Sequence, residues 1–184
     1  IFFFFVLSAA APAAKTQALR ALAALLIERQ PDILKANALD VDAAKAANMD
    51  ARRLDRLTLT PRIMADMADA CLHVAEMADE VGVIEQQWQR PNGLMIGKMR
   101  IPLGVIAMIF ESRPNVTIDA AILCLKAGDA VILRGGSEAI HSNLARAGLL
   151  HEALRSAGLP EDAAQVVETT DRAAVAALCK LDKY

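Results

Sequence analysis

The chain has 184 residues, of which 55% are hydrophobic and 23% charged, and its formal net charge at pH 7 is −2. This length suits one ordinary domain, and the composition excludes intrinsic disorder and linker-like chains. The 20 basic and 22 acidic side chains nearly balance, without a basic run, which argues against nucleic-acid binding.

The first six residues, IFFFFV, differ from the rest of the chain because they hold four of its five Phe. A secretion signal would carry a basic leader before this apolar run, and the sequence shows none. The run is interrupted by Ser8 and Pro12 and is too short for a membrane-spanning helix of about 20 residues. We interpret residues 1–6 as a cloning or gene-prediction irregularity, expect no membrane association, and assign the fold to residues 7–184.

Helices are expected over the first 80 residues. Apolar residues at three- and four-residue steps predict a helix over 15–29, which Pro31 ends, and two shorter helical pieces over 32–37 and 41–47. A Thr-Pro pair at 60–61 supplies an N-cap and a first-turn proline for a longer helix. The apolar stripe of that helix consists of Ile63, Met67, Cys71, Val74 and Ala78.

A different pattern begins after Gly82. Two extendable runs, 83–90 and 94–101, are joined by Pro-Asn-Gly and predict a β-hairpin. Short apolar runs then alternate with helical segments, which predicts an α/β fold with an open, parallel, Rossmann-like sheet and right-handed crossover helices. The expected strands are 105–110, 130–133 and 165–168, and the expected helices are 117–127, 137–156 and 171–179. The first two strands are continuously apolar, so both of their faces are expected to be buried.

Two loops follow the first two of these strands, where ligands bind in open parallel sheets. The first, ESRPNVT at 111–117, places a guanidinium, an amide and a hydroxyl before a helix. The second, RGGSE at 134–138, has paired glycines between a cation and an acceptor. Together they predict an anion or nucleotide site, although a tight turn and a surface salt bridge of Arg113 are the plainer alternatives. GxGxxG and GxxxxGK[ST] are both absent, so any nucleotide must be held differently.

Cys71, Cys124 and Cys179 are widely spaced within expected helices. This spacing predicts neither a disulfide framework nor a metal site, and it favours a reducing, cytoplasmic setting. All three are interpreted as small core residues. Core positions are also expected for three methionines, Met64, Met67 and Met77.

The run from Arg90 to Asn143 contains PLGVI, ESRPNVT, DAA, LCLK and ILRGGSEAIHSN in order. In these motifs it resembles the γ-glutamyl phosphate reductases, or glutamate-5-semialdehyde dehydrogenases, of the aldehyde dehydrogenase superfamily. A weaker resemblance extends back to about Ala14 and forward to Tyr184. It implies the NADPH-dependent reduction of γ-glutamyl phosphate to glutamate-5-semialdehyde with release of phosphate, in proline biosynthesis. The chemistry implied is displacement of phosphate by a Cys thiolate and reduction of the thioester.

The same resemblance implies roles for residues of the two loops. Arg134 and Glu138 are expected to hold the adenosine ribose of NADP, and Gly135, Gly136 and Ser137 to shape their loop. Asn115 is expected to stabilise an oxyanion. Ser112 and Arg113 are expected to bind phosphate or the glutamate carboxylate, and the hairpin is expected to belong to an oligomerisation segment, which predicts a homo-oligomer.

The sequence departs from the family in one respect. The family's chains are longer, and their nucleophilic Cys would lie beyond Tyr184, since none of the three cysteines matches its position. We therefore expect a chain that comprises the amino-terminal helices, the hairpin and part of the NADP-binding domain, without the catalytic domain and inactive alone. Two alternatives stay open: a stand-alone nucleotide-binding or regulatory module without catalysis, and a helical interaction protein in which the loops are relics.

Overall fold

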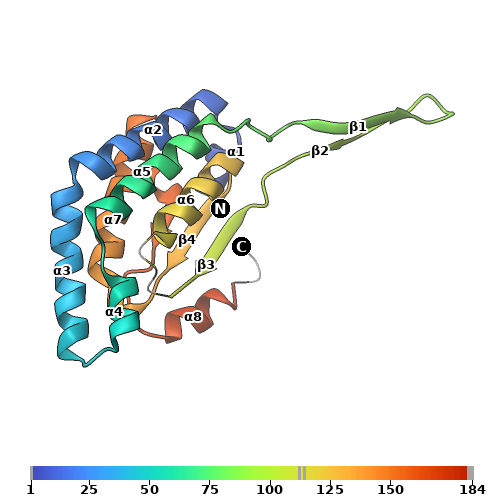
Figure 1. Ribbon diagram of the computed structural model, residues 1–184. Helices are drawn as coiled ribbons and strands as arrows, with labels where there is room; N and C mark the ends of the chain where they lie inside the picture. Colours follow the sequence, from blue (N-terminus) through green and yellow to red (C-terminus); the bar gives the residue numbers. More distant parts are fainter. Residues whose placement is uncertain (1, 112, 114, 182–184) are drawn as a thin grey trace.

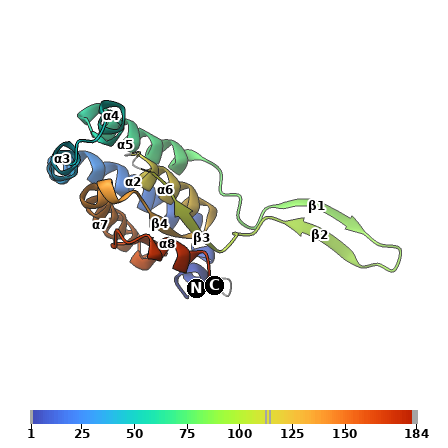
Figure 2. The same cartoon turned by 90° about the horizontal axis from the view of Figure 1, so that it is seen from below.

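The computed structural model describes residues 2–111, 113 and 115–181, which form a layer of helices against a small sheet, with a hairpin projecting to one side (Figures 1 and 2). The helices are α1 (Phe2–Ser8), α2 (Pro12–Glu28), α3 (Gln30–Ala46), α4 (Ala51–Leu57), α5 (Pro61–Glu76), α6 (Val116–Ala127), α7 (Ile140–Ser156) and α8 (Ala173–Leu178), with 3-10 turns η1 (Ser137–Ala139) and η2 (Glu161–Ala163). The strands are β1 (Ile84–Gln89), β2 (Met95–Met99), β3 (Val105–Ile109), β4 (Ala130–Arg134) and β5 (Ala164–Val166).

The predicted α/β class is confirmed by the larger sheet. Its order is β3-β4-β5, and both neighbouring pairs are parallel. The crossover helix α6 ends in Gly128, which is left-handed at φ 81°, a conformation that suits glycine. Because parallel strands bring their carboxyl ends to one edge, the loops after β3 and β4 lie at the same side of the sheet.

The helices before the sheet differ from the expected ones in two respects. The pieces expected at 32–37 and 41–47 are one helix, α3, because its polar residues Asn37 and Asp40 do not break it but bond to other elements. The short helix α4 was not among the individual helices expected. Its N-cap is Asp50, whose carboxylate accepts a hydrogen bond from the backbone N of Arg53 at 3.1 Å.

The amino-terminal residues also form a helix. Residues 2–8 make α1, which runs across the boundary that the sequence suggests between residues 6 and 7, and Leu7 of this helix is fully buried. No single helix of the described chain has the length and apolar character needed to cross a bilayer. Only α1 and α2 together have that length and apolar character, and the chain bends by 106° between these two helices.

The main core lies between α2, α5, α6, α7 and the sheet. Its largest members come from each layer: Leu19, Leu22 and Leu26 of α2, Met64, Met67 and Cys71 of α5, Ile118 and Ile122 of α6, Leu133 of β4, and Leu150 and Leu154 of α7. The core positions expected for Met64, Met67 and Cys71 are thereby confirmed. Those expected for Met77 and Cys179 were wrong, because Met77 lies beyond the end of α5 and Cys179 follows α8, which has no buried residue.

The strand β3 is less buried than its apolar sequence predicts. Met108 is 36% exposed and Ile109 45%, whereas Val131 and Leu133 of β4 are buried. The reason is position in the sheet, because β3 pairs only with β4 and forms an edge of it within the described chain. The expectation that both faces of this strand are buried was wrong for β3.

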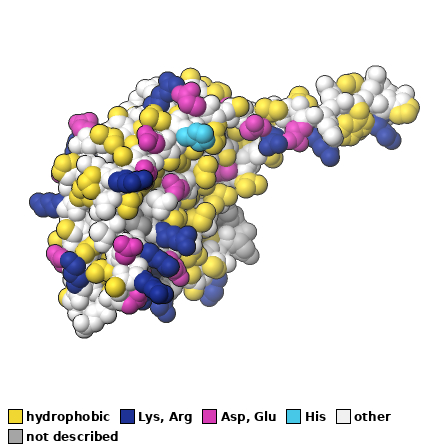
Figure 3. Space-filling model, viewed as in Figure 1, with side chains coloured by type: hydrophobic (Ala, Val, Ile, Leu, Met, Phe, Trp, Pro, Cys, Tyr) yellow, Lys and Arg dark blue, Asp and Glu magenta, His cyan; other side chains and the backbone are white. Residues whose placement is uncertain are grey.

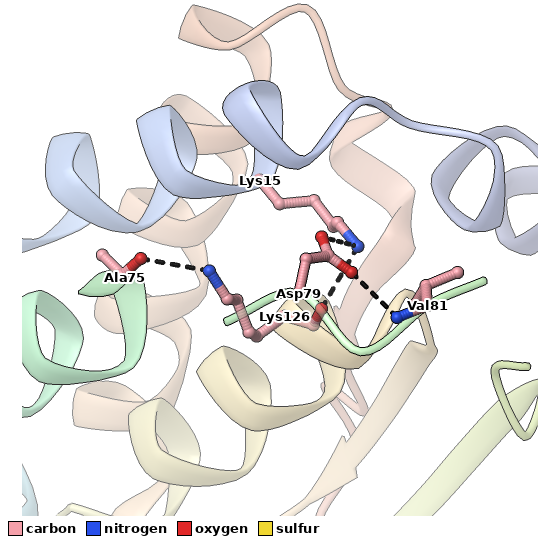
Figure 4. A network of polar contacts seen from close by, with 5 residues as sticks. All are labelled: Lys15, Ala75, Asp79, Val81 and Lys126. Carbon is pink, nitrogen blue, oxygen red and sulfur yellow. Dashed lines mark hydrogen bonds and ion pairs between the residues drawn. The ribbon is translucent and has the colours of Figure 1, made fainter. Parts of the chain in front are cut away.

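A buried ion pair ties the helical layer together (Figure 4). Lys15 Nζ of α2 lies 2.6 Å from Asp79 Oδ2, beyond α5, and donates a hydrogen bond to the backbone O of Lys126 at 3.3 Å. Lys126 Nζ in turn donates to the backbone O of Ala75 at 3.0 Å. Both ammonium groups are therefore satisfied although their side chains are almost fully buried.

The predicted hairpin is confirmed as the antiparallel pair β1–β2, with Gly93 at φ +86° in its turn. It extends away from the body of the molecule, and its surface carries many apolar side chains (Figures 1 and 3). The exposed apolar residues are Ile84, Trp88, Leu94, Met95 and Met99.

Candidate functional site

The two loops identified from the sequence line one hollow of about 730 Å³, called here the first hollow. The loop after β3 contributes Glu111 and Arg113, and the loop after β4 contributes Arg134, Gly136, Ser137 and Glu138. Further lining residues come from α4, from the segment before α8 and from α8 itself: Arg53, Arg56, Thr170, Arg172, Val175 and Ala176. Figure 3 shows basic side chains, with acidic ones among them, gathered on the face near α4 and the end of β3. Five arginines against two glutamates make this hollow attractive to an anion.

Arg134 forms part of the wall of this hollow. The residue is 8% exposed, and its guanidinium donates hydrogen bonds to the backbone O of Gly135 and, at 3.1 Å, to the backbone O of Thr170. Its buried Nε has no acceptor among the described residues. The guanidinium therefore holds the two sides of the hollow together and keeps donor capacity that these bonds do not use.

The paired glycines allow a close approach of chain segments. A Cβ at Gly135 would collide with Nδ2 of Asn143 and come within 3.2 Å of the Phe110 ring, and one at Gly136 would lie 2.7 Å from Oε2 of Glu138. Gly136 borders the first hollow, whereas Gly135 does not line it and packs against Asn143 and Phe110. A side chain at Gly135 would require Asn143 or Phe110 to move, whereas at Gly136 the nearest atoms belong to the carboxylate of Glu138, which can rotate away.

A buried polar network holds the helix start that follows the loop at 134–138. Asp40 of α3 accepts hydrogen bonds from the backbone N of His141 at 3.1 Å and of Ser142 at 2.8 Å, and also from the Ser142 hydroxyl. It thereby satisfies donors at the start of α7, which follows the loop directly. No local pattern in the sequence indicates this contact between residues about 100 positions apart.

Asn143, the next residue of α7, extends the same network. Asn143 Oδ1 accepts hydrogen bonds from Thr117 Oγ1 and from Nη2 of Arg146, each at 2.8 Å. Arg146 is fully buried, and this burial lowers its pKa to about 10, although the nearby Asp40 acts in the opposite direction. The start of α6, which follows the first loop, and the start of α7 are thus joined through Asn143.

A second hollow, of about 570 Å³, adjoins the first. It lies between α5 and the start of α6, and is lined by Asp55, Arg56, Ile63, Asp66, Met67, Ala70, Arg113, Asn115 and Asp119. Asn115 Nδ2 donates a hydrogen bond to Asp119 Oδ2 at 2.6 Å. Burial raises the pKa of Asp119, and the hydrogen bond from Asn115 opposes this rise.

The structure thus brings most of the predicted site residues together. Arg113, Arg134, Gly136, Ser137 and Glu138 share the first hollow, Asn115 lines the second, and Gly135 lies beneath the loop. Ser112 lies outside the described residues.

Sequence reasoning missed the arginines at 53, 56 and 172. The signal for the first two was the spacing of three residues in ARRLDRL, which places Arg53 and Arg56 on one face of a helix. For Arg172, we find no signal in the sequence.

The buried cysteines are poor nucleophiles. Burial, and to a lesser extent the charge of Asp119, raises the pKa of Cys71 to about 12. Burial, followed by Asp129, raises the pKa of Cys124, which is half-buried, to about 11. Since the thiolate is the reactive form, neither side chain is prepared for attack at neutral pH.

Comparisons with known proteins agree with one another. The model of the "Aldehyde dehydrogenase family" matches residues 4–183. A γ-glutamyl phosphate reductase of Nitratidesulfovibrio vulgaris is 70% identical over 178 residues, an alignment that covers 97% of this chain and 42% of the relative. The crystal structure of γ-glutamyl phosphate reductase from Thermotoga maritima superposes with a TM-score of 0.97 at 38% identity and covers 100% of this chain and 44% of that one.

More distant structures share the fold alone. A probable aldehyde dehydrogenase from Listeria monocytogenes is 15% identical with a TM-score of 0.70, over 96% of this chain and 36% of that one. In each of these three comparisons, the chain spans less than half the length of the protein it matches.

Proposed function

The chain belongs to the aldehyde dehydrogenase family, and we propose that it is part of an NADPH-dependent γ-glutamyl phosphate reductase. The proposed reaction reduces the acyl phosphate of glutamate to glutamate-5-semialdehyde and releases phosphate, as a step of proline biosynthesis. The 70% identity to a relative of that name supports it. The structural observation that carries it is the first hollow, where Arg113, Arg134 and Glu138 converge from two strand ends.

The residues of the first hollow fit a dinucleotide phosphate. Arg134 keeps a buried N–H without an acceptor in the described part of the chain, and the glycine pair leaves a backbone that no Cβ covers. Arg53, Arg134 and Arg172 supply positive charge for the phosphate groups of the cofactor. Glu138 supplies an acceptor for a ribose hydroxyl. We assign the adenosine ribose of NADP to Arg134 and Glu138, with Gly135, Gly136 and Ser137 shaping the loop. The arginines around Glu138 support a preference for NADP, because a 2′-phosphate needs a cation.

The remaining roles follow from position. When bound, the cofactor supplies a hydride, and the second hollow, next to the first, offers space for the glutamyl substrate. Asn115 borders this space with an amide that can donate to a developing oxyanion. Arg113 borders both hollows and is assigned to substrate anions, with Ser112 beside it in the sequence.

The nucleophile is assigned to another part of the protein. Cys71 and Cys124 have raised pKa values, and none of the three cysteines lines either hollow. We therefore propose that the reactive Cys belongs to a catalytic domain outside these 184 residues, and that this chain supplies helices, hairpin and part of the NADP-binding domain. The three cysteines, none of which forms a disulfide, support the proposal of a cytoplasmic setting.

The hairpin supports the proposal of a homo-oligomer. A two-stranded hairpin alone is marginally stable in water, and this one exposes several large apolar side chains. A second copy of the protein would cover them and stabilise the strands. Its role would then be assembly and not chemistry.

The proposed function is tested in the direction of oxidation with the full-length protein. Glutamate-5-semialdehyde, NADP⁺ and inorganic phosphate are expected to give γ-glutamyl phosphate, NADPH and a proton. NADPH formation is followed by absorbance with and without phosphate. NADPH formation that requires phosphate supports the proposed reductase function. If no NADPH forms under any condition, the proposed function is contradicted.

A further inference from the structure

The two hollows share two lining residues, and both are arginines. Arg56 of α4 and Arg113 of the loop after β3 line the first hollow and also the second. Both residues therefore border the place where the two hollows meet. Neither arginine forms an ion pair within 4.0 Å with a carboxylate of the described chain, and Arg56 is exposed to solvent.

Resting on the proposed function, we propose that Arg56, together with Arg113, binds the phosphate of the acyl-phosphate substrate where the two hollows meet. Hydride transfer requires the nicotinamide to touch the carbonyl carbon that is reduced. If the first hollow holds the cofactor and the second the substrate, that carbon lies at their junction. The phosphate is bonded to the same carbonyl, so it lies at the junction too.

The charges of the second hollow orient the substrate in the same sense. Away from the shared arginines, this hollow is lined by three carboxylic residues, Asp55, Asp66 and Asp119. Such groups repel a phosphate but attract the α-ammonium group of a glutamyl substrate. The ammonium end therefore points into the second hollow and the phosphate end towards Arg56 and Arg113.

The neighbours of Arg56 on α4 provide matched comparisons. Arg53 lines the first hollow only, and its Nε lies 4.0 Å from Asp50 Oδ2. Arg52 lines neither hollow. Three arginines of one short helix thus differ in which hollow they border, so the loss of a charge from α4 can be separated from the loss of a phosphate contact.

The test measures kinetic constants of the full-length protein in the oxidative direction, where inorganic phosphate is a substrate. Arg56→Gln is expected to raise the KM for phosphate about tenfold or more and to leave that for NADP⁺ nearly unchanged, because one charge-assisted contact to phosphate is lost. Arg56→Lys keeps the charge but not the planar donor fork, so its KM for phosphate is expected to lie between those of the wild type and of Arg56→Gln. Arg52→Gln is expected to change neither constant.

Each outcome bears on the proposal. An unchanged phosphate KM in Arg56→Gln overturns it while leaving the reductase function standing, provided that the wild type still needs phosphate. An equal rise of both KM values also overturns it, because Arg56 would then serve the cofactor. If the wild type itself shows no reaction that depends on phosphate, the proposed function fails and this inference fails with it. If Arg56→Gln does not fold, the phosphate KM of Arg56→Lys decides: an increase supports the proposal and wild-type behaviour overturns it.

Discussion

Arg134 Nη2 donates a hydrogen bond of 3.1 Å to the backbone O of Thr170, a residue 36 positions further along the chain. This bond joins the end of β4 to the segment before α8, and both border the first hollow. A residue that the sequence marks only as a cation thus also fixes the shape of its own site.

The glycine pair gives the first prediction. Gly135→Ala places a Cβ against Asn143 and Phe110, so we expect the free energy of unfolding to fall by about 1–3 kcal/mol and the affinity for NADPH to fall as well. Gly148→Ala is the control, because Gly148 lies within α7 with open space around it, and alanine there is expected to stabilise by about 1 kcal/mol. Urea unfolding and NADPH titration measure both effects. A Gly135→Ala variant as stable as the control would contradict the tight packing of this loop.

The cysteines are predicted to differ in reactivity. Since the pKa of Cys71 is raised to about 12, its thiol stays protonated as the pH rises from 7 to 9, and iodoacetamide labelling stays slow. Cys179, which is exposed in this structure, is expected to label at least about tenfold faster. Mass spectrometry of the native protein locates the labels, and unfolded protein, in which all three react, is the control. Rapid native labelling of Cys71 would contradict its burial.

The buried ion pair predicts a large loss of stability. Asp79→Asn leaves the ammonium of Lys15 buried without its carboxylate, which is expected to cost about 3–5 kcal/mol in the free energy of unfolding. Glu76→Gln removes an exposed ion pair with Arg20 in the same helical layer, and its expected cost is below about 1 kcal/mol. Urea unfolding followed by circular dichroism compares the two variants. Equal losses of unfolding free energy in the two variants would show that the buried Lys15–Asp79 pair stabilises the fold no more than the exposed pair does.

The hairpin is predicted to mediate assembly. Trp88 and Met95 are exposed on adjacent strands, and changing both to Glu would put charges into any contact that the hairpin makes. We expect the full-length protein to be an oligomer by sedimentation and this double variant to be a smaller species. Leu39→Glu, at an exposed apolar position of α3, is the control and should leave the assembly unchanged. An unchanged sedimentation coefficient in the double variant would exclude the hairpin as the contact.

The alternation of strands and helices was predictable because it rests on local signals. Continuous apolar runs at 105–110 and 130–133 mark strands, and Gly128 marks the end of the helix between them. The convergence of the loops after β3 and β4 then follows from the geometry of parallel strands. This is why the sequence alone predicts that Arg113, Arg134 and Glu138 lie at one site, and all three line the first hollow.

Part of what the sequence could not show depends on distant partners. The helix α4 has seven residues, three of them arginines. Its Asp50 cap is a local contact, but the burial of Leu57 depends on the elements packed around it. The bonds of Asp40 to the start of α7 link residues that no local pattern relates. A short apolar run predicts a strand, but it does not tell whether that strand lies at the edge of the sheet, as β3 does.

The central claim is that the first hollow binds NADP through Arg134. Its most direct test is titration of the full-length protein with NADPH, followed by nucleotide fluorescence, for the wild type, Arg134→Met and Arg155→Met. Arg155 is an exposed arginine of α7 that pairs with Glu161 and does not line either hollow, so its loss should leave the Kd unchanged. We predict that Arg134→Met raises the Kd for NADPH about tenfold or more, because a charged donor to the nucleotide is removed. Equal Kd values for Arg134→Met and the wild type would contradict the claim.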